Sequence, residues 1–214
     1  VAEWRRRLDL LQRGNMRMFL MSHEVFPVHP HPNYVAQARE NIEKYLATFG
    51  DHPAFGGIEF DEIHFGNCWC RICRPMFHEY LKTRFSRDEM VEIGLVKGKV
   101  EEVDQIAGPA QDERTANPGL HTVRMEWRAH VFEQAARSAF DRLRELRPDA
   151  LAHVLLSPAN FTSFTNRDWG GPFGAPLYRM AALADMITID PYWNGVPEEA
   201  YWCDMMRAHA RGPA

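Results

Sequence analysis

The sequence has no apolar run long enough to cross a bilayer, since its longest runs, such as Leu151 to Leu156, are far too short. It also has no basic segment followed by an apolar core, so no signal peptide is visible and we expect a cytoplasmic protein. Positive charge is not in excess either. The net charge is −4, which gives no electrostatic reason to expect a nucleic acid or an anionic membrane as partner.

Cysteine is scarce and unevenly placed. Of the four cysteines, Cys68, Cys70 and Cys73 lie within six residues, and Cys203 stands alone. A disulfide framework would spread its cysteines, and neighbours in a C-x-C pair rarely reach disulfide geometry together. Thiolates this close are most easily held around a cation, with Zn²⁺ the common choice. Three reduced cysteines without metal are the alternative, and an iron–sulfur cluster fits less well because it needs a fourth thiolate.

The sequence also lacks an initial Met and opens directly in a helix-like segment, VAEWRRRLDLLQR. We therefore expect an excerpt of a longer chain, either processed or cut.

Hydrophobic patterning predicts strands alternating with helices. Short apolar runs predict strands over 16–22, 55–63, 151–157 and 186–193, and helical periodicity predicts helices over 34–49, 73–85 and 122–147. Residues 86–120 are the least regular and are interpreted as an insertion. This alternation indicates an α/β fold with a parallel sheet and covering helices.

Polar residues follow each predicted strand, where active sites gather in such folds. They are His23 and Glu24, then Asp61 and Glu62, then Ser157 and Asn160, and finally Asp190 and Tyr192. Strand ends also turn polar simply on meeting solvent, so the pattern indicates a site without assigning its chemistry.

Several motifs occur in a familiar order. The stretch GDHPAFGGIEFDE is followed by C-x-C-x-x-C and by the helix FHEYLKTRF, and LSPANFTSF and LADMITIDPYW come later. Together they resemble the glycoside hydrolases of the family 42 β-galactosidase type and their barrel relatives. The resemblance covers about Met16 to Trp193, and the cysteine spacing and GDHPA are its most specific parts.

The resemblance implies a (β/α)8 TIM barrel of which strands three to six are present, so residues 1–214 would be a single catalytic-type domain, incomplete at both ends. It implies a glycoside hydrolase acting on β-linked sugars, with Glu62 as general acid/base. The implied mechanism is retaining, and retaining enzymes pair a carboxylic acid of raised pKa with a second carboxylate about 5 Å away. The family's nucleophile is a Glu at the end of strand seven, which is expected outside this chain.

Two departures from the family affect the predicted site. The family has Asn where this chain has Asp61, and that Asn binds a sugar hydroxyl. The family's other cysteine, in the loop after strand three, is absent, while His29 and His31 are present there. The resemblance therefore implies a structural zinc held by Cys68, Cys70 and Cys73, with one of these histidines as fourth ligand.

The carbohydrate substrate is expected to contact Asp61, Asn160, Asp190, Tyr192 and Trp193, although aromatic residues also cover barrel rims without binding anything. Two alternatives stay open. One is a non-catalytic barrel that binds sugar or a partner, motivated by Asp61 and the missing nucleophile. The other is a metal-dependent hydrolase that uses His23, Asp61, His64 and Asp190. A partial barrel would expose its sheet edges, so a homo-oligomer is also left open.

Overall fold

The computed structural model of the chain describes residues 2–22, 31–61, 68–108, 113–156, 177–189 and 204. Its strands are β1 (Met18–Ser22), β2 (Phe55–Asp61), β3 (Leu151–Leu156) and β4 (Met186–Ile189). They form one parallel sheet in the order β1-β2-β3-β4, so each strand pairs with the next one along the chain. The predicted α/β architecture and strand order are confirmed.

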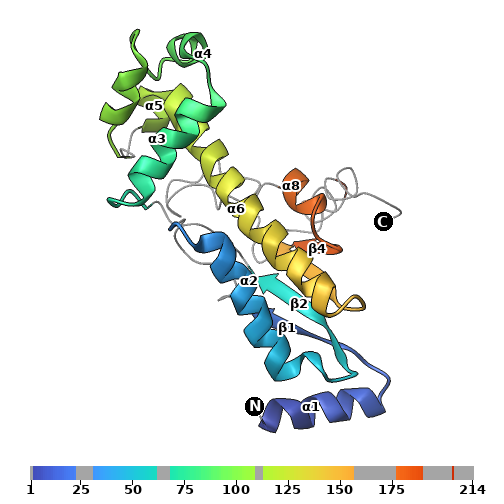
Figure 1. Cartoon of the computed structure of the whole chain (residues 1–214). Helices are drawn as coiled ribbons and strands as arrows, with labels where there is room; N and C mark the ends of the chain where they lie inside the picture. Colours follow the sequence, from blue (N-terminus) through green and yellow to red (C-terminus); the bar gives the residue numbers. More distant parts are fainter. Residues whose placement is uncertain are drawn as a thin grey trace.

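Helices cover one face of this sheet. Figure 1 shows α2 (Tyr34–Tyr45) and the long α6 (Pro118–Leu146) side by side over the strands. Ile58 and Phe60 of β2 are fully buried under them, and the Phe60 ring packs on Phe140 of α6. This alternate pair of β2 residues faces the helices because successive side chains of a strand point to opposite faces.

Most of the remaining helices lie at the two ends of this layer. At one end, α3 (Cys73–Arg84), α4 (Arg87–Glu92) and α5 (Glu113–Ala116) gather around the start of α6, away from the sheet (Figure 1). The 3-10 helix η2 (Val100–Gln105) contacts α3. At the other end, α1 (Ala2–Arg13) precedes β1, whereas α8 (Leu177–Ala181), which precedes β4, lies beside α6, where Arg179 pairs with Glu133 at 2.8 Å (Figure 1). Among the described residues, no helix is both long and apolar enough to cross a membrane.

The GDHPA motif forms the turn into β2 and holds α1. His52 Nδ1 accepts a hydrogen bond from the Ala54 amide at 3.1 Å, and His52 Nε2 lies 3.1 Å from an Asp9 oxygen on α1. Asp51 pairs with Arg5 of the same helix at 2.8 Å. The turn precedes β2 directly, and Phe55, the first residue of that strand, is fully buried.

Several element boundaries differ from the sequence-based prediction, and the helical ones differ for local reasons. The predicted helix 34–49 ends as α2 at Tyr45 and continues as a π-helical turn, η1 (Leu46–Gly50). The long helix begins at Pro118, because the Asn117 side chain accepts a hydrogen bond from the Leu120 amide and caps it. Residues 86–120, predicted as an irregular insertion, contain α4, η2 and α5. The division into domains stays a prediction.

Candidate functional site

The carboxyl ends of the parallel strands meet along one edge of the sheet. Asp61 is the last residue of β2 and pairs with Leu155 of β3, so this edge lies immediately before Glu62. Glu62 itself lies outside the described residues. So do the other residues that the sequence placed at this edge, namely His23, Glu24, His64, Ser157, Asn160, Asp190, Tyr192 and Trp193. Their predicted roles stay predictions.

Polar side chains also occupy the sheet face that points away from α2 and α6. Glu59 of β2 pairs in register with His153 of β3, and its Oε2 lies 2.8 Å from His153 Nδ1. The other ring nitrogen lies 2.8 Å from the Thr188 hydroxyl of β4. His153 is only 4% exposed, and this burial lowers its pKa, with the Glu59 carboxylate opposing the shift. This chain of contacts was not predicted from the sequence, although Glu59, His153 and Thr188 interrupt otherwise apolar strands.

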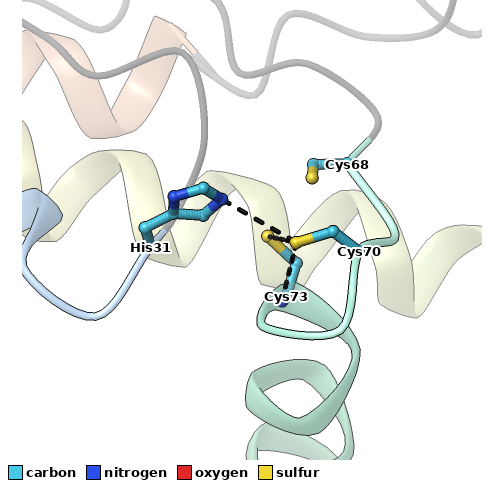
Figure 2. Close-up of side chains that lie close together, drawn as sticks. All are labelled: His31, Cys68, Cys70 and Cys73. Atoms are coloured by element: carbon cyan, nitrogen blue, oxygen red, sulfur yellow. Dashed lines mark hydrogen bonds between the residues drawn. The ribbon is translucent and has the colours of Figure 1, made fainter.

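The second concentration of functional groups is the cysteine cluster. One ligand atom each from His31, Cys68, Cys70 and Cys73 lies within 4.8 Å of every other. Figure 2 shows the four side chains turned toward one another from two separate segments, the turn before α2 and the start of α3. The Cys70 sulfur lies 3.6 Å from the Cys73 sulfur and 3.8 Å from His31 Nε2. His29, the other histidine considered, lies outside the described residues.

Local backbone geometry favours a thiolate at Cys70. The amides of Cys73 and Ile72, at the start of α3, donate to the Cys70 sulfur at 3.5 and 3.4 Å and lower its pKa to about 6. Free amides at the first turn of a helix stabilise negative charge in this way. Burial, by contrast, raises the pKa of the Cys73 thiol. A bound cation would offset that burial, because a coordinating thiol loses its proton.

The donor set fits a soft divalent metal ion. Three sulfurs and one imidazole nitrogen form a Cys3His set, which is a common set for structural zinc. Four protein ligands would also occupy every coordination position of a tetrahedral ion and leave none for water or substrate. The cluster is thus suited to stabilising the fold and poorly suited to activating a nucleophile.

Three residues beside the cluster were not predicted from the sequence to have a role there, namely Trp69, Arg124 and Glu113. Trp69, between two of the cysteines, packs on Phe77 of α3, and the Arg124 guanidinium of α6 lies over its ring. Arg124 is paired in turn with Glu113, the first residue of α5. In the sequence, the large apolar Trp69 between Cys68 and Cys70 indicates that this loop packs against the protein interior.

Comparison with known proteins bears on the same elements. The sequence model of the glycoside hydrolase 42 family, described as beta-galactosidase, matches residues 8–212. A relative, Beta-galactosidase Pbg of Clostridium perfringens, is 25% identical over 166 residues, which cover 72% of this chain and 22% of that protein.

Solved structures show the same fold. The β-galactosidase from Rahnella sp. R3 superposes with a TM-score of 0.68 at 17% identity, covering 99% of this chain and 36% of that one. The β-galactosidase from Bacillus circulans sp. alkalophilus gives 0.65 at 15% identity, covering 96% and 35%. A catalytic mutant of a GH42 β-galactosidase from G. stearothermophilus gives 0.63 at 19% identity, covering 91% and 33%. The chain has the fold of part of a TIM barrel, as predicted, and spans about a third of these structures.

Proposed function

The chain belongs to the glycoside hydrolase 42, or β-galactosidase, family, and from that premise we propose that the intact protein hydrolyses β-linked galactosides with Glu62 as general acid/base. The observation that carries the proposal is that β2 ends at Asp61, the residue that precedes Glu62 in the sequence. That end of the strand lies at the edge of the barrel where substrates bind in enzymes of this fold.

The proposed reaction is double displacement with retention. The Glu62 carboxylic acid donates its proton to the glycosidic oxygen while a carboxylate from outside this chain attacks the anomeric carbon. The leaving alcohol departs, and a glycosyl–enzyme ester remains. Glu62, now a carboxylate, then takes a proton from a water molecule as the water oxygen bonds to the anomeric carbon, which breaks the ester bond and frees both the sugar and the nucleophile's carboxylate.

The sugar is proposed to contact Asp61, Asn160, Asp190, Tyr192 and Trp193, with the aromatic rings stacking on its apolar face. Asp61 differs from the family's Asn in one chemical respect, because an ionised carboxylate accepts hydrogen bonds but donates none. A sugar hydroxyl at this position would therefore act as a donor. The same difference favours the second candidate function, a barrel that binds sugar without cleaving it.

The test is Glu62→Gln in the intact protein, assayed on a chromogenic β-galactoside. Losing the proton donor is expected to lower kcat about 10²–10⁴-fold. The matched control is Glu40→Gln, since Glu40 is exposed on α2 and should leave kcat unchanged. Undiminished activity in Glu62→Gln contradicts the assignment. An inactive wild type that still binds galactosides in calorimetry would support the non-catalytic alternative.

We also propose that His31, Cys68, Cys70 and Cys73 hold one structural Zn²⁺. The four converging donors support this, together with the lowered pKa of Cys70. The ion would neutralise the thiolates and tie the turn before α2 to the start of α3. Elemental analysis of the purified protein should find one zinc per chain. A Cys70→Ser variant that keeps a full equivalent of zinc would contradict this ligand set.

A cytoplasmic location is proposed on the same chemistry. Thiols this close stay reduced, and free to bind metal, in a reducing compartment. Fractionation of the producing cells, with a cytoplasmic marker as reference, tests this. Self-association is a separate proposal, supported by the open edges that β1 and β4 leave on the sheet of the described residues. Sedimentation of the intact protein tests it.

A further inference from the structure

Arg124 carries a buried positive charge beside the cysteine cluster. It is 4% exposed, and its partner Glu113 is 6% exposed. Arg124 Nε lies 2.9 Å from both carboxylate oxygens of Glu113, and Nη2 donates to the Ala107 carbonyl. Among the described residues, Arg124 Nη1 has no hydrogen-bond partner. A buried ion pair contributes little net stability, because removing two charges from water offsets their attraction.

The guanidinium is placed against the ring that separates two of the cysteines. The Arg124 Cζ atom lies 4.2 Å from the centre of the Trp69 ring and 4.9 Å from that of Phe77. These distances are within the range of cation–π attraction, which strengthens when the groups are shielded from water. Trp69 follows Cys68 and precedes Cys70, so a ring held in one position limits how far the backbone that carries both sulfurs can move.

The other neighbours of Trp69 leave its ring little freedom. Phe77 packs edge-on against it with centroids 5.4 Å apart, and His78 does so at 5.7 Å. Gly108 passes so close that a Cβ there would lie 2.7 Å from the indole Cδ1. The Ala107 carbonyl just before it is the one that Arg124 binds. Arg124 thus connects Trp69, the backbone at Ala107 and Glu113 of α5.

We propose that Glu113 and Arg124 are positioning residues for the metal, which hold Trp69 and thereby keep the Cys68 and Cys70 sulfurs in ligating geometry. This inference rests on the zinc site proposed above. Neither side chain ligates the ion. Glu113 and Arg124 would lengthen the residence time of the bound zinc. If the loop that carries Cys68 and Cys70 moved freely, these sulfurs would dissociate from the metal more often.

The test is the rate at which the intact protein releases zinc to a chromogenic chelator. Arg124→Met keeps the length of the side chain and removes its charge, and we expect release about 10–100-fold faster, the usual effect of losing a residue that orients metal ligands. Arg124→Lys keeps a cation near Trp69 and should restore part of the difference. Arg137→Met is the matched control, since Arg137 lies on the same helix, is exposed, and pairs with Glu133 at the surface.

A second variant covers the case in which Arg124→Met leaves Glu113 charged and unpaired and the protein unfolds. The double replacement of Glu113→Gln with Arg124→Met removes both charges together. In the cobalt-substituted protein, this variant should shift the visible bands of the thiolate-bound ion, whereas Arg137→Met should not.

The outcomes separate the two proposals. A wild type that holds no zinc or cobalt overturns both the metal site and the positioning role. A wild type that holds zinc, with unchanged release and cobalt spectra in the folded Arg124→Met and double variants, overturns the positioning role alone.

Discussion

Glu59 and His153 lie directly opposite each other on neighbouring strands, with 2.8 Å between the carboxylate Oε2 and the imidazole Nδ1. The ring is held from its other side by the Thr188 hydroxyl at 2.8 Å. A neutral imidazole serves both contacts, since Nδ1–H can face the carboxylate while Nε2 accepts from the hydroxyl. The structure therefore favours the uncharged form of His153.

This arrangement makes stability depend on pH. Because burial lowers the pKa of His153, the unfolded chain binds a proton at a higher pH than the folded protein does. The free energy of unfolding should fall as the pH drops below about 6.5, the ordinary value for histidine. His153→Gln should flatten part of this dependence in urea titrations over that range. Burial lowers the pKa of His78 in the same direction, so some slope should persist. An equal slope in wild type and variant contradicts the prediction.

Gly57 should resist substitution. Its φ is +156°, and a Cβ there would lie 2.0 Å from the Leu151 carbonyl oxygen, so β2 and β3 could not keep their register. Gly57→Ala should lower the free energy of unfolding by about 3 kcal/mol or more. Gly98→Ala is the control, because nothing lies within 4 Å of its added Cβ. Chemical unfolding of both variants measures the difference, and equal effects would contradict the close approach.

The Phe60–Phe140 contact joins the sheet to α6. Both side chains are fully buried, and their centroids lie 4.8 Å apart. Phe140→Ala should therefore cost about 3–5 kcal/mol of unfolding free energy. Leu146→Ala, at an exposed position of the same helix, should change it by under about 1 kcal/mol. Urea denaturation compares them, and a small effect of Phe140→Ala would place α6 elsewhere.

His31 is expected to complete the metal site. His31→Ala should leave three thiolates and weaken zinc binding, whereas His31→Cys should keep zinc in a four-thiolate set. Equilibrium dialysis followed by elemental analysis measures both. Cys203→Ser is the control, since Cys203 is remote in sequence from the cluster. Full zinc retention in His31→Ala would show that another residue supplies the fourth ligand.

The alternation of strands and helices could be predicted from the sequence, because each strand is a short apolar run between helical segments, whereas the order of the strands in the sheet followed from the resemblance to a barrel. The predicted start of α6, at 122, is four residues too late, because Pro118 begins the helix behind the Asn117 cap within a stretch predicted to be irregular. The cluster of Cys68, Cys70 and Cys73 could be predicted because its members are close in sequence, and so could His31 as one of two candidates.

The roles of Arg124 and Glu113 beside the cysteine cluster could not be predicted from the sequence. Arg124 and Arg137 lie on the same helix and look alike in sequence, yet one is buried over Trp69 and the other is exposed. Only the packing of α3 and α5 against α6 distinguishes them. Glu113 sits in the segment with the weakest periodicity, and so its pairing with Arg124 depends entirely on tertiary contacts.

The long connection between β2 and β3 has a consequence for the order in which the protein can assemble during synthesis. His31 and the three clustered cysteines are all translated before β3, so the four proposed zinc ligands leave the ribosome before β3 and β4 have been made. Glu113 and Arg124 follow later, on α5 and α6. A nascent chain would thus be able to bind the proposed zinc before Glu113 and Arg124, the residues proposed to hold Trp69 in place, have been made.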